Sequence, residues 1–248
     1  MTSQTTSPAL SPTASNPTAS PATSPLSGPA SGPATATVRA IWTDFGGVLT
    51  APIGQTLTDF CARTNVEPEP LVRAMMKVAS SYGTDDIMLP IDTPLVSEPE
   101  WTAQIAAVLA EDHQMRLGVS TLADVWFGDR PANEAWIQRL RRARADGLFV
   151  GMLSNMVPAW DEHWRRMVDP AALFDAVVLS FEVGHRKPGR EIFDLAAERA
   201  GVAPAECLFV DDLAKNCDGA VAAGWQAIHF TDTAVAVAEL DRLLQPAR

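Results

Sequence analysis

The sequence predicts an α/β protein built on a doubly wound parallel sheet. Its 248 residues contain short, almost continuously apolar runs that alternate with segments of helical periodicity. Such runs are typical of parallel strands covered by helices on both faces, and their alternation with helices is the pattern of a doubly wound domain. Glycines follow several helical segments at positions where they commonly end helices. We expect strands at 37–43, 148–153, 176–180, 207–210 and 226–230.

The helices of this domain follow from the same alternation, and we expect them at 133–145, 159–167, 190–200, 214–223 and 234–244. Between the first and second strands the alternation breaks, because the segment has helical patterns without a convincing strand. We interpret it as a helical insert after the first strand and a candidate cap over a site. Helices that simply pack on the sheet are the alternative. Helices are expected at 55–63, 70–80, 98–111 and 120–127, with 81–99 as a loop.

Three segments of different composition divide the chain. Residues 1–36 are mostly Ser, Thr, Pro and Ala and carry no charged side chain. They have little apolar surface to offset the entropy of ordering, so we predict a disordered tail. Residues 37–52 and 131–248 would form the sheet domain, and residues 53–130 the helical cap.

Composition and charge exclude several classes of function. A net charge of −11 and a pI near 4.7 argue against binding to nucleic acid or an anionic membrane, although one pocket can still bind a small anion. No apolar run reaches the roughly 18–20 residues that cross a bilayer, and the N-terminus lacks a secretory pattern. The three cysteines show no zinc or disulfide spacing. We expect a cytoplasmic protein in a reducing compartment, and the oligomeric state stays open.

An aspartate follows the first predicted strand. Asp44 precedes Gly46 and Gly47, which permit a tight turn and a close approach of ligand to backbone. In doubly wound sheets, ligands bind beyond the carboxyl ends of the strands. A carboxylate there can attack phosphorus and form an acyl phosphate that water later hydrolyses. An aspartate that merely caps a turn has about even odds on this motif alone.

Two adjacent acids, Asp211 and Asp212, follow the fourth predicted strand. Placed near Asp44, they would repel it unless a cation lay between them. Mg²⁺ fits, because it prefers oxygen ligands and is usually held by one or two carboxylates with waters. Asn216 would lie on the same face of the first helical turn. The alternative is an acidic helix N-terminus favoured by the helix dipole.

Three further polar residues complete the candidate site. Ser154 and Asn155 follow the second predicted strand and could donate hydrogen bonds to phosphate oxygens, although a helix cap is the commoner role. Lys187 could reach both an aspartate nucleophile and a phosphate; a solvated loop cation is the alternative. We favour neither of its neighbours, His185 and Arg186, as catalytic.

The order of these motifs resembles the haloacid dehalogenase superfamily of hydrolases. The resemblance covers about residues 38–232, and its details are similar to the branch with bacterial glucose-1-phosphate phosphatases and the N-terminal phosphatase domain of soluble epoxide hydrolases. The motifs that carry it are Asp44-x-Gly-x-Val, Ser154-Asn155, Gly184-x-x-Lys187-Pro188 and Asp211-Asp212-x-x-x-Asn216.

The resemblance implies a Rossmann-like core with a helical cap inserted after the first strand. It implies that Asp44 is the nucleophile and that Lys187 steadies it. It also implies phosphate binding by Ser154 and Asn155. The implied Mg²⁺ ligands are the Asp44 carboxylate, the Gly46 backbone carbonyl and Asp212, with Asp211 supporting.

Gly46 departs from the superfamily pattern. Most of its phosphatases carry a second aspartate at this position, which protonates the leaving oxygen and then activates water. General acid–base catalysis is typically worth about 10²–10⁴-fold, so its loss should slow turnover. Glycine keeps the backbone carbonyl and also occurs in the glucose-1-phosphate phosphatase-like branch.

The sequence therefore predicts a Mg²⁺-dependent phosphatase that acts on a small phosphorylated metabolite through an aspartyl-phosphate intermediate. One alternative is a metal-independent 2-haloacid dehalogenase, which also uses an aspartate nucleophile; the Asp211–Asp212 pair argues against it. The other is a catalytically silent binding or regulatory protein, which Gly46 and the long tail motivate.

Overall fold

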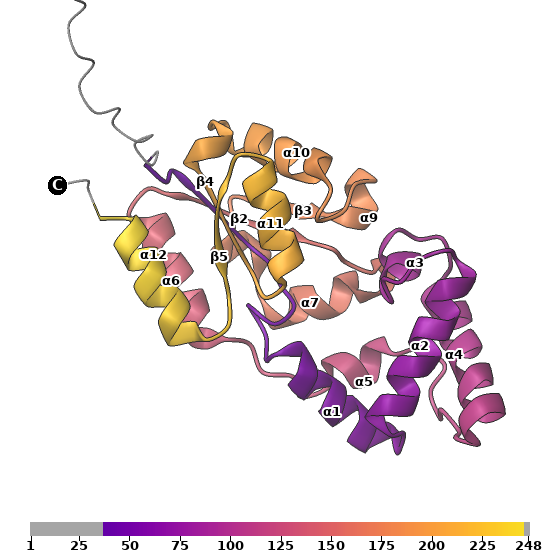
Figure 1. Ribbon diagram of the computed structural model, residues 1–248. Coiled ribbons are helices and arrows are strands. Elements are labelled where there is room, and N and C mark those ends of the chain that lie inside the picture. The colour runs from indigo at the N-terminus through magenta and orange to yellow at the C-terminus, as the bar shows by residue number, and fades with distance from the viewer. Residues whose placement is uncertain (1–36, 246–248) are drawn as a thin grey trace, which may run out of the picture. The chain divides into compact units, whose positions relative to one another are not determined.

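A five-stranded sheet forms the centre of the described part of the chain, which is residues 37–245 in a computed structural model (Figure 1). The predicted tail at 1–36 lies outside the described residues. All four strand pairings are parallel, in the order β3-β2-β1-β4-β5. The predicted doubly wound α/β fold is confirmed. The strands are β1 (Ala40–Thr43), β2 (Phe149–Ser154), β3 (Ala176–Leu179), β4 (Cys207–Asp211) and β5 (Gln226–His229).

Both faces of the sheet are buried, which explains why its strands have apolar rather than alternating sequences. All four residues of β1 are buried, with Ile41 facing one apolar layer and Trp42 the other. The Trp42 ring lies directly over Gly151 of β2, where a Cβ would approach it to 2.5 Å. A glycine is therefore required beneath this ring.

Helices cover the sheet on both sides (Figure 1). On one side α6 and α12 pack together against β2 and β5, and on the other α10 and α11 pack together. Short helices that we did not expect precede and follow β3 and precede β4, and the predicted strand 176–180 ends at Leu179. The elements are α6 (Glu134–Ala145), η1 (Pro158–Trp160), α7 (Asp161–Met167), α8 (Pro170–Leu173), α9 (Ser180–Val183), α10 (Arg190–Ala200), η2 (Pro204–Glu206), α11 (Ala214–Ala222) and α12 (Thr233–Leu243).

The segment between β1 and α6 is helical, as expected, and its described residues contain no strand apart from a single bridge between Thr50 and Ala132. We call residues 53–130 the helical insert. The prediction of a loop over 81–99 is wrong in part, because α3 forms there and α4 already begins at Glu98. A buried Ile91 and a buried Asp92 hold α3 in place. The insert comprises α1 (Ile53–Thr64), α2 (Pro68–Ser81), α3 (Leu89–Asp92), α4 (Glu98–His113) and α5 (Ala123–Phe127).

A buried carboxylate ties the insert to the sheet domain. Glu98, at the start of α4, accepts hydrogen bonds from the backbone N–H groups of Leu122 and Ala123 and from Nε1 of Trp160 in η1. These residues belong to one compact unit with the sheet. Within residues 37–245, no helix combines the length and the apolar character needed to cross a membrane.

Candidate active site

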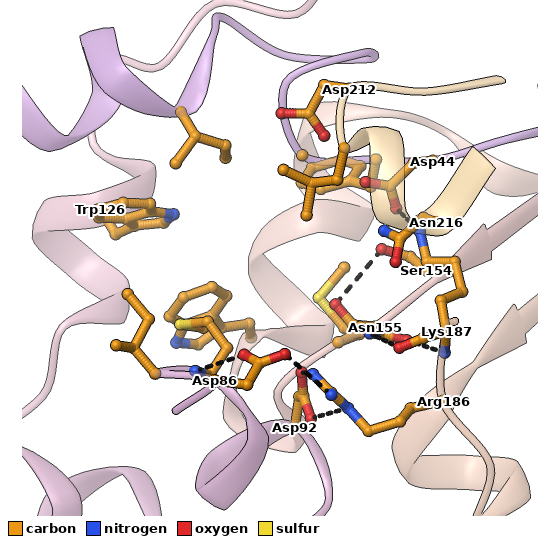
Figure 2. Close-up of a pocket in the computed structure, with 18 of the residues that line it drawn as sticks. Asp44, Asp86, Asp92, Trp126, Ser154, Asn155, Arg186, Lys187, Asp212 and Asn216 are labelled. Carbon is orange, nitrogen blue, oxygen red and sulfur yellow. Dashed lines mark hydrogen bonds and ion pairs between the residues drawn. The ribbon is translucent and has the colours of Figure 1, made fainter. Parts of the chain in front are cut away.

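The polar residues that follow neighbouring strands meet in one pocket. β1 lies between β2 and β4, so Asp44 after β1 has Ser154 at the end of β2 on one side and Asp211 at the end of β4 on the other. Asp44, Ser154 and Asp212 line a cavity of about 340 Å³, and Figure 2 shows the side chains of these three residues. The candidate side chains from three separate motifs therefore share a single site.

The two glycines in the turn after Asp44 differ in backbone conformation and in the space around them. Gly47 has a φ of +74°, in the left-handed region, and a Cβ there would lie 2.3 Å from Oδ2 of Asp212. A side chain at position 47 would therefore displace Asp212. Gly46 has no positive φ, and its Cβ would meet only the end of the Ile53 side chain, at 3.2 Å. Position 46 could hold a side chain after a small shift of Ile53.

Lys187 lies between two buried aspartates. Its Nζ is 2.8 Å from Oδ1 of Asp44 and 2.6 Å from Oδ2 of Asp211, and its side chain is 1% exposed. Burial alone lowers the pKa of Lys187, but the charges of Asp211 and Asp44 outweigh it, so the pKa is raised. The lysine is therefore a permanent cation in the site.

Asn155 fixes the backbone at Lys187. Its side-chain amide donates to the carbonyl of Lys187 at 3.0 Å, and its oxygen accepts from the N–H of Lys187 at 2.8 Å. The peptide bond between Lys187 and Pro188 is cis. This pair of hydrogen bonds leaves one amide hydrogen of Asn155 for a ligand, so the side chain positions the lysine whatever else it binds.

The two adjacent acids have different surroundings. Asp211 is fully buried and accepts hydrogen bonds from the backbone N–H of Leu213 and from Nδ2 of Asn216, besides its contact with Lys187. Across the described residues, no side chain pairs with the carboxylate of Asp212. Burial, followed by the charges of Asp44 and Asp211, raises the pKa of Asp212 to about 7.

Asp44 is also held in an environment that opposes its charge. Burial raises its pKa, the charge of Lys187 lowers it and that of Asp211 raises it again, with a raised pKa as the net result. Carboxylate oxygens of Asp44, Asp211 and Asp212 lie within 4.8 Å of one another. Three hard oxygen donors at this spacing fit a divalent cation such as Mg²⁺, whose charge would relieve their repulsion.

Arg186, which we did not favour as a catalytic residue, joins the insert to the sheet domain. Its guanidinium binds both carboxylate oxygens of Asp92, at 2.7 and 3.0 Å, and Oδ2 of Asp86 at 3.0 Å. Lys215 also lies 3.0 Å from Asp86. These four residues line one end of the pocket. The acidic composition of 81–99 was the only local signal, and it did not reveal the partners.

Arg130, at the end of the insert, is a second pocket residue that sequence reasoning missed. Its Nη2 donates to the carbonyl of Ala51 at 3.3 Å, its guanidinium lies 5.7 Å from the Trp126 ring, and its Nε is buried without a hydrogen-bond partner. Burial lowers its pKa to about 10, against the opposing charges of Asp212 and Asp44. No carboxylate of the described residues forms an ion pair with Arg130, and its charge interacts from the insert with those of Asp212 and Asp44.

The match to a family model agrees with this geometry. Residues 38–224, about three quarters of the chain, match the model of the haloacid dehalogenase-like hydrolases. The chain belongs to this family. The predicted membership is thus confirmed, and the protein is a haloacid dehalogenase-like hydrolase.

The curated relatives of this hydrolase include named phosphatases. It is 35% identical over 106 residues to the sesquiterpene phosphatase astK of Aspergillus oryzae, covering 42% of this chain and 54% of the relative. It is 37% identical over 124 residues to the phosphatase MT3486 of Mycobacterium tuberculosis, covering 48% and 52%. The alignments span about half the length of these two relatives.

Solved structures with the same fold include both phosphate-bound and dehalogenating proteins. The haloacid dehalogenase-like hydrolase superposes on the family enzyme BT-2542 of Bacteroides thetaiotaomicron, in complex with magnesium and inorganic phosphate, with a TM-score of 0.55 at 21% identity, covering 77% of this chain and 93% of that one. For the L-2-haloacid dehalogenase RSc1362 the TM-score is 0.63 at 21% identity, covering 83% and 100%. Likeness at this identity establishes the fold.

Proposed function

We propose that this hydrolase is a Mg²⁺-dependent phosphatase that cleaves phosphomonoesters through a covalent phosphoryl group on Asp44. The observation that carries the proposal is the pairing of buried Asp44 with Lys187, at 2.8 Å, next to the unpaired carboxylate of Asp212. A nucleophile, a fixed cation and a cation site in one pocket are what phosphoryl transfer requires, because its catalysis is mostly positioning and charge stabilisation.

In the proposed reaction an oxygen of Asp44 attacks phosphorus, and the bond between phosphorus and the ester oxygen breaks. The leaving oxygen takes a proton from water, and the alcohol departs. A water molecule then attacks the phosphorus of the aspartyl phosphate and gives a proton to the hydroxide left by the first step, which releases inorganic phosphate and restores the carboxylate. The charge of Lys187 lowers the pKa of Asp44 against the effect of burial and would offset the charge of the phosphoryl oxygens.

The acids of the pocket would hold the metal. Asp44 and Asp212 would be ligands together with the carbonyl of Gly46, and a bound Mg²⁺ would supply positive charge to the phosphoryl group. Asp211 would support this arrangement, since it already binds Lys187 and Asn216. Its role is then to place the lysine and limit the charge of the cluster.

Ser154 and Asn155 would bind the phosphoryl oxygens. Ser154 lies at the end of β2, lines the pocket and interacts with Asp44 closely enough to lower its pKa. Its hydroxyl can donate to a phosphate oxygen, as can the remaining amide hydrogen of Asn155.

A metal-independent 2-haloacid dehalogenase is the second candidate, and its motivation is the fold shared with RSc1362 together with the missing acid at position 46. Such an enzyme would use the same Asp44–Lys187 pair. The cluster of three acids opposes it, because without a cation they would repel an anionic 2-haloacid.

The test uses the purified full chain with a panel of phosphate esters and 2-haloacids, with Mg²⁺ or with EDTA. Phosphate release that needs Mg²⁺ and disappears in Asp44→Asn supports the proposal. Halide release that continues in EDTA would establish the dehalogenase instead. No turnover of either class, with tight binding of a partner, would favour a silent binding protein.

A further inference from the structure

The insert provides an apolar wall for the pocket. Ile53 and Leu57 of α1, Val72 and Met75 of α2, and Trp126 and Phe127 of α5 all line it. Figure 2 shows Trp126 across the pocket from Asp44, Lys187 and Asn216. Ile53 is 37% exposed, so part of this wall presents apolar surface that the protein itself does not cover.

The wall offers little to a hydroxylated ligand. Among the described lining residues, the insert contributes no hydroxyl, amide or imidazole side chain. Its two acids, Asp86 and Asp92, are engaged by Arg186, and Asp86 also by Lys215. A sugar or polyol held there would leave several hydroxyl groups without partners, and each unpaired buried polar group costs binding free energy.

Apart from the indole N–H of Trp126, the remaining polar group of the wall is the guanidinium of Arg130, which belongs to the phosphate end of the pocket. The guanidinium of Arg130 interacts electrostatically with Asp212 and Asp44, and its buried Nε has no hydrogen-bond partner among the described residues. A phosphoryl group beside Asp44 would supply an anion for it. Beyond this cation the wall is hydrocarbon and indole.

We propose that the substrate is the phosphate monoester of an apolar alcohol, whose hydrocarbon part packs against this wall while its phosphate lies at Asp44 and Lys187. The inference rests on the proposed function, which leaves the alcohol open. A cavity of about 340 Å³ falls within the range of pockets that enclose small ligands. Apolar surface on both partners then supplies the affinity that hydrogen bonds supply in enzymes acting on sugar phosphates.

The dependence of kcat/KM on the length of the substrate's alkyl chain tests this proposal. Each methylene transferred from water to an apolar site contributes about 0.8 kcal/mol, a factor of about four in kcat/KM. We expect kcat/KM with the full chain and Mg²⁺ to rise about two- to fourfold per methylene from ethyl through butyl and hexyl phosphate until the cavity is filled. A terminal hydroxyl on hexyl phosphate should cost up to about 10²-fold.

The outcomes separate this inference from the function on which it rests. Turnover that is flat along the series, or faster for glucose 6-phosphate than for hexyl phosphate, overturns the apolar alcohol but leaves a phosphatase. If no ester is hydrolysed, the phosphatase fails, and calorimetry with non-hydrolysable alkylphosphonates decides the inference. Affinity that grows with chain length upholds the apolar site, and equal affinities refute it.

A pair of matched variants locates the effect in the wall. Leu57→Asn places an amide of similar size on a half-buried position of α1 that lines the pocket. Leu195→Asn makes the same change on a half-buried position of α10 away from the pocket. Leu57→Asn should flatten the dependence of kcat/KM on chain length, while Leu195→Asn should keep it. Equal slopes in the two variants would contradict the assignment.

Discussion

The two walls of the pocket differ in the charged groups that they present. At the carboxyl ends of β1 and β4, which we call the sheet edge of the pocket, Lys187 lies between Asp44 and Asp211. Each of these buried charges has a partner. On the insert, the wall around Leu57 and Trp126 is apolar, and its acids are tied to Arg186. The first wall therefore presents charged groups at fixed positions, and the second presents mainly apolar surface.

This difference has a physical cause. A buried charge is tolerated only with partners at defined positions, so the residues at the strand ends constrain one another. Apolar contacts have no such directional requirement, and hydrophobic residues of similar volume exchange at small cost. Changes at the sheet edge should therefore affect the chemical step, whereas changes in the insert should affect the choice of substrate.

The largest expected effect is that of Asp44→Asn. The amide is not a nucleophile, so kcat for any phosphate ester should fall on the order of 10⁴-fold or more. The fold should persist, because burial already disfavours the charge at this position. Steady-state phosphate release and thermal unfolding check the two parts. Substantial residual turnover would remove Asp44 from the chemical step.

Gly46→Asp is expected to have the next largest effect on activity, and in the opposite direction. If turnover lacks only a proton donor, a carboxyl group here should raise kcat by about 10²-fold, at the low end for acid–base catalysis because Ile53 must shift. Gly46→Asn fills the same space without an acidic proton. A gain for aspartate alone identifies proton transfer; similar rates in both variants would show that it does not limit turnover.

Lys187→Met tests the charge balance of the sheet edge. Removal of the cation leaves two buried acids facing each other, which should cost about 3–5 kcal/mol of unfolding free energy in metal-free buffer. Lys215→Met is the control, because that lysine is 54% exposed and its ion pair with Asp86 should contribute under about 1 kcal/mol. Urea denaturation measures both. Equal losses would mean that burial does not distinguish the two pairs.

The smallest effect concerns the insert acids, whose pKa values shift in opposite directions. Burial raises the pKa of Asp92 from 3.8 to about 6, so its protonated form is favoured in the folded state and stability falls as pH rises from about 4 to about 6. Burial also acts on Asp86, but Lys215 and Arg186 lower its pKa, so its contribution to stability is lost only on further acidification.

Asp92→Asn should therefore flatten the change of melting temperature between pH 4 and 6, whereas Asp86→Asn should only reduce that slope, because the charge of Asp86 is a smaller cause of the raised pKa of Asp92 than burial is. Thermal unfolding of both variants along a pH series measures the difference. An unchanged slope in Asp92→Asn would assign the titration to another group.

The sequence predicts the sheet edge better than the insert, and the reason is locality. Asp44, Ser154 and Asp211 each follow an apolar run directly, so their convergence follows from the parallel order of the strands. Lys187 was found through its motif rather than through periodicity, and its contact with both Asp44 and Asp211 required the structure.

The contacts and pocket-lining residues of the insert could not be predicted from local sequence patterns. The partners of Arg186 lie 94 and 100 residues earlier in the chain, and no local pattern connects them. The helix α3 has only four residues in a segment rich in proline and acids, so its periodicity is too short to detect. Helical periodicity also shows which side chains avoid water without showing which of them, such as Trp126, border a cavity.

Arg186 and Lys187 are adjacent in the chain, yet their side chains form ion pairs with different parts of the molecule. Arg186 holds Asp86 and Asp92 of the insert, while Lys187 holds Asp44 and Asp211. The position of the insert and that of the ammonium are therefore linked through one peptide bond, which the hydrogen bonds of Asn155 hold in place.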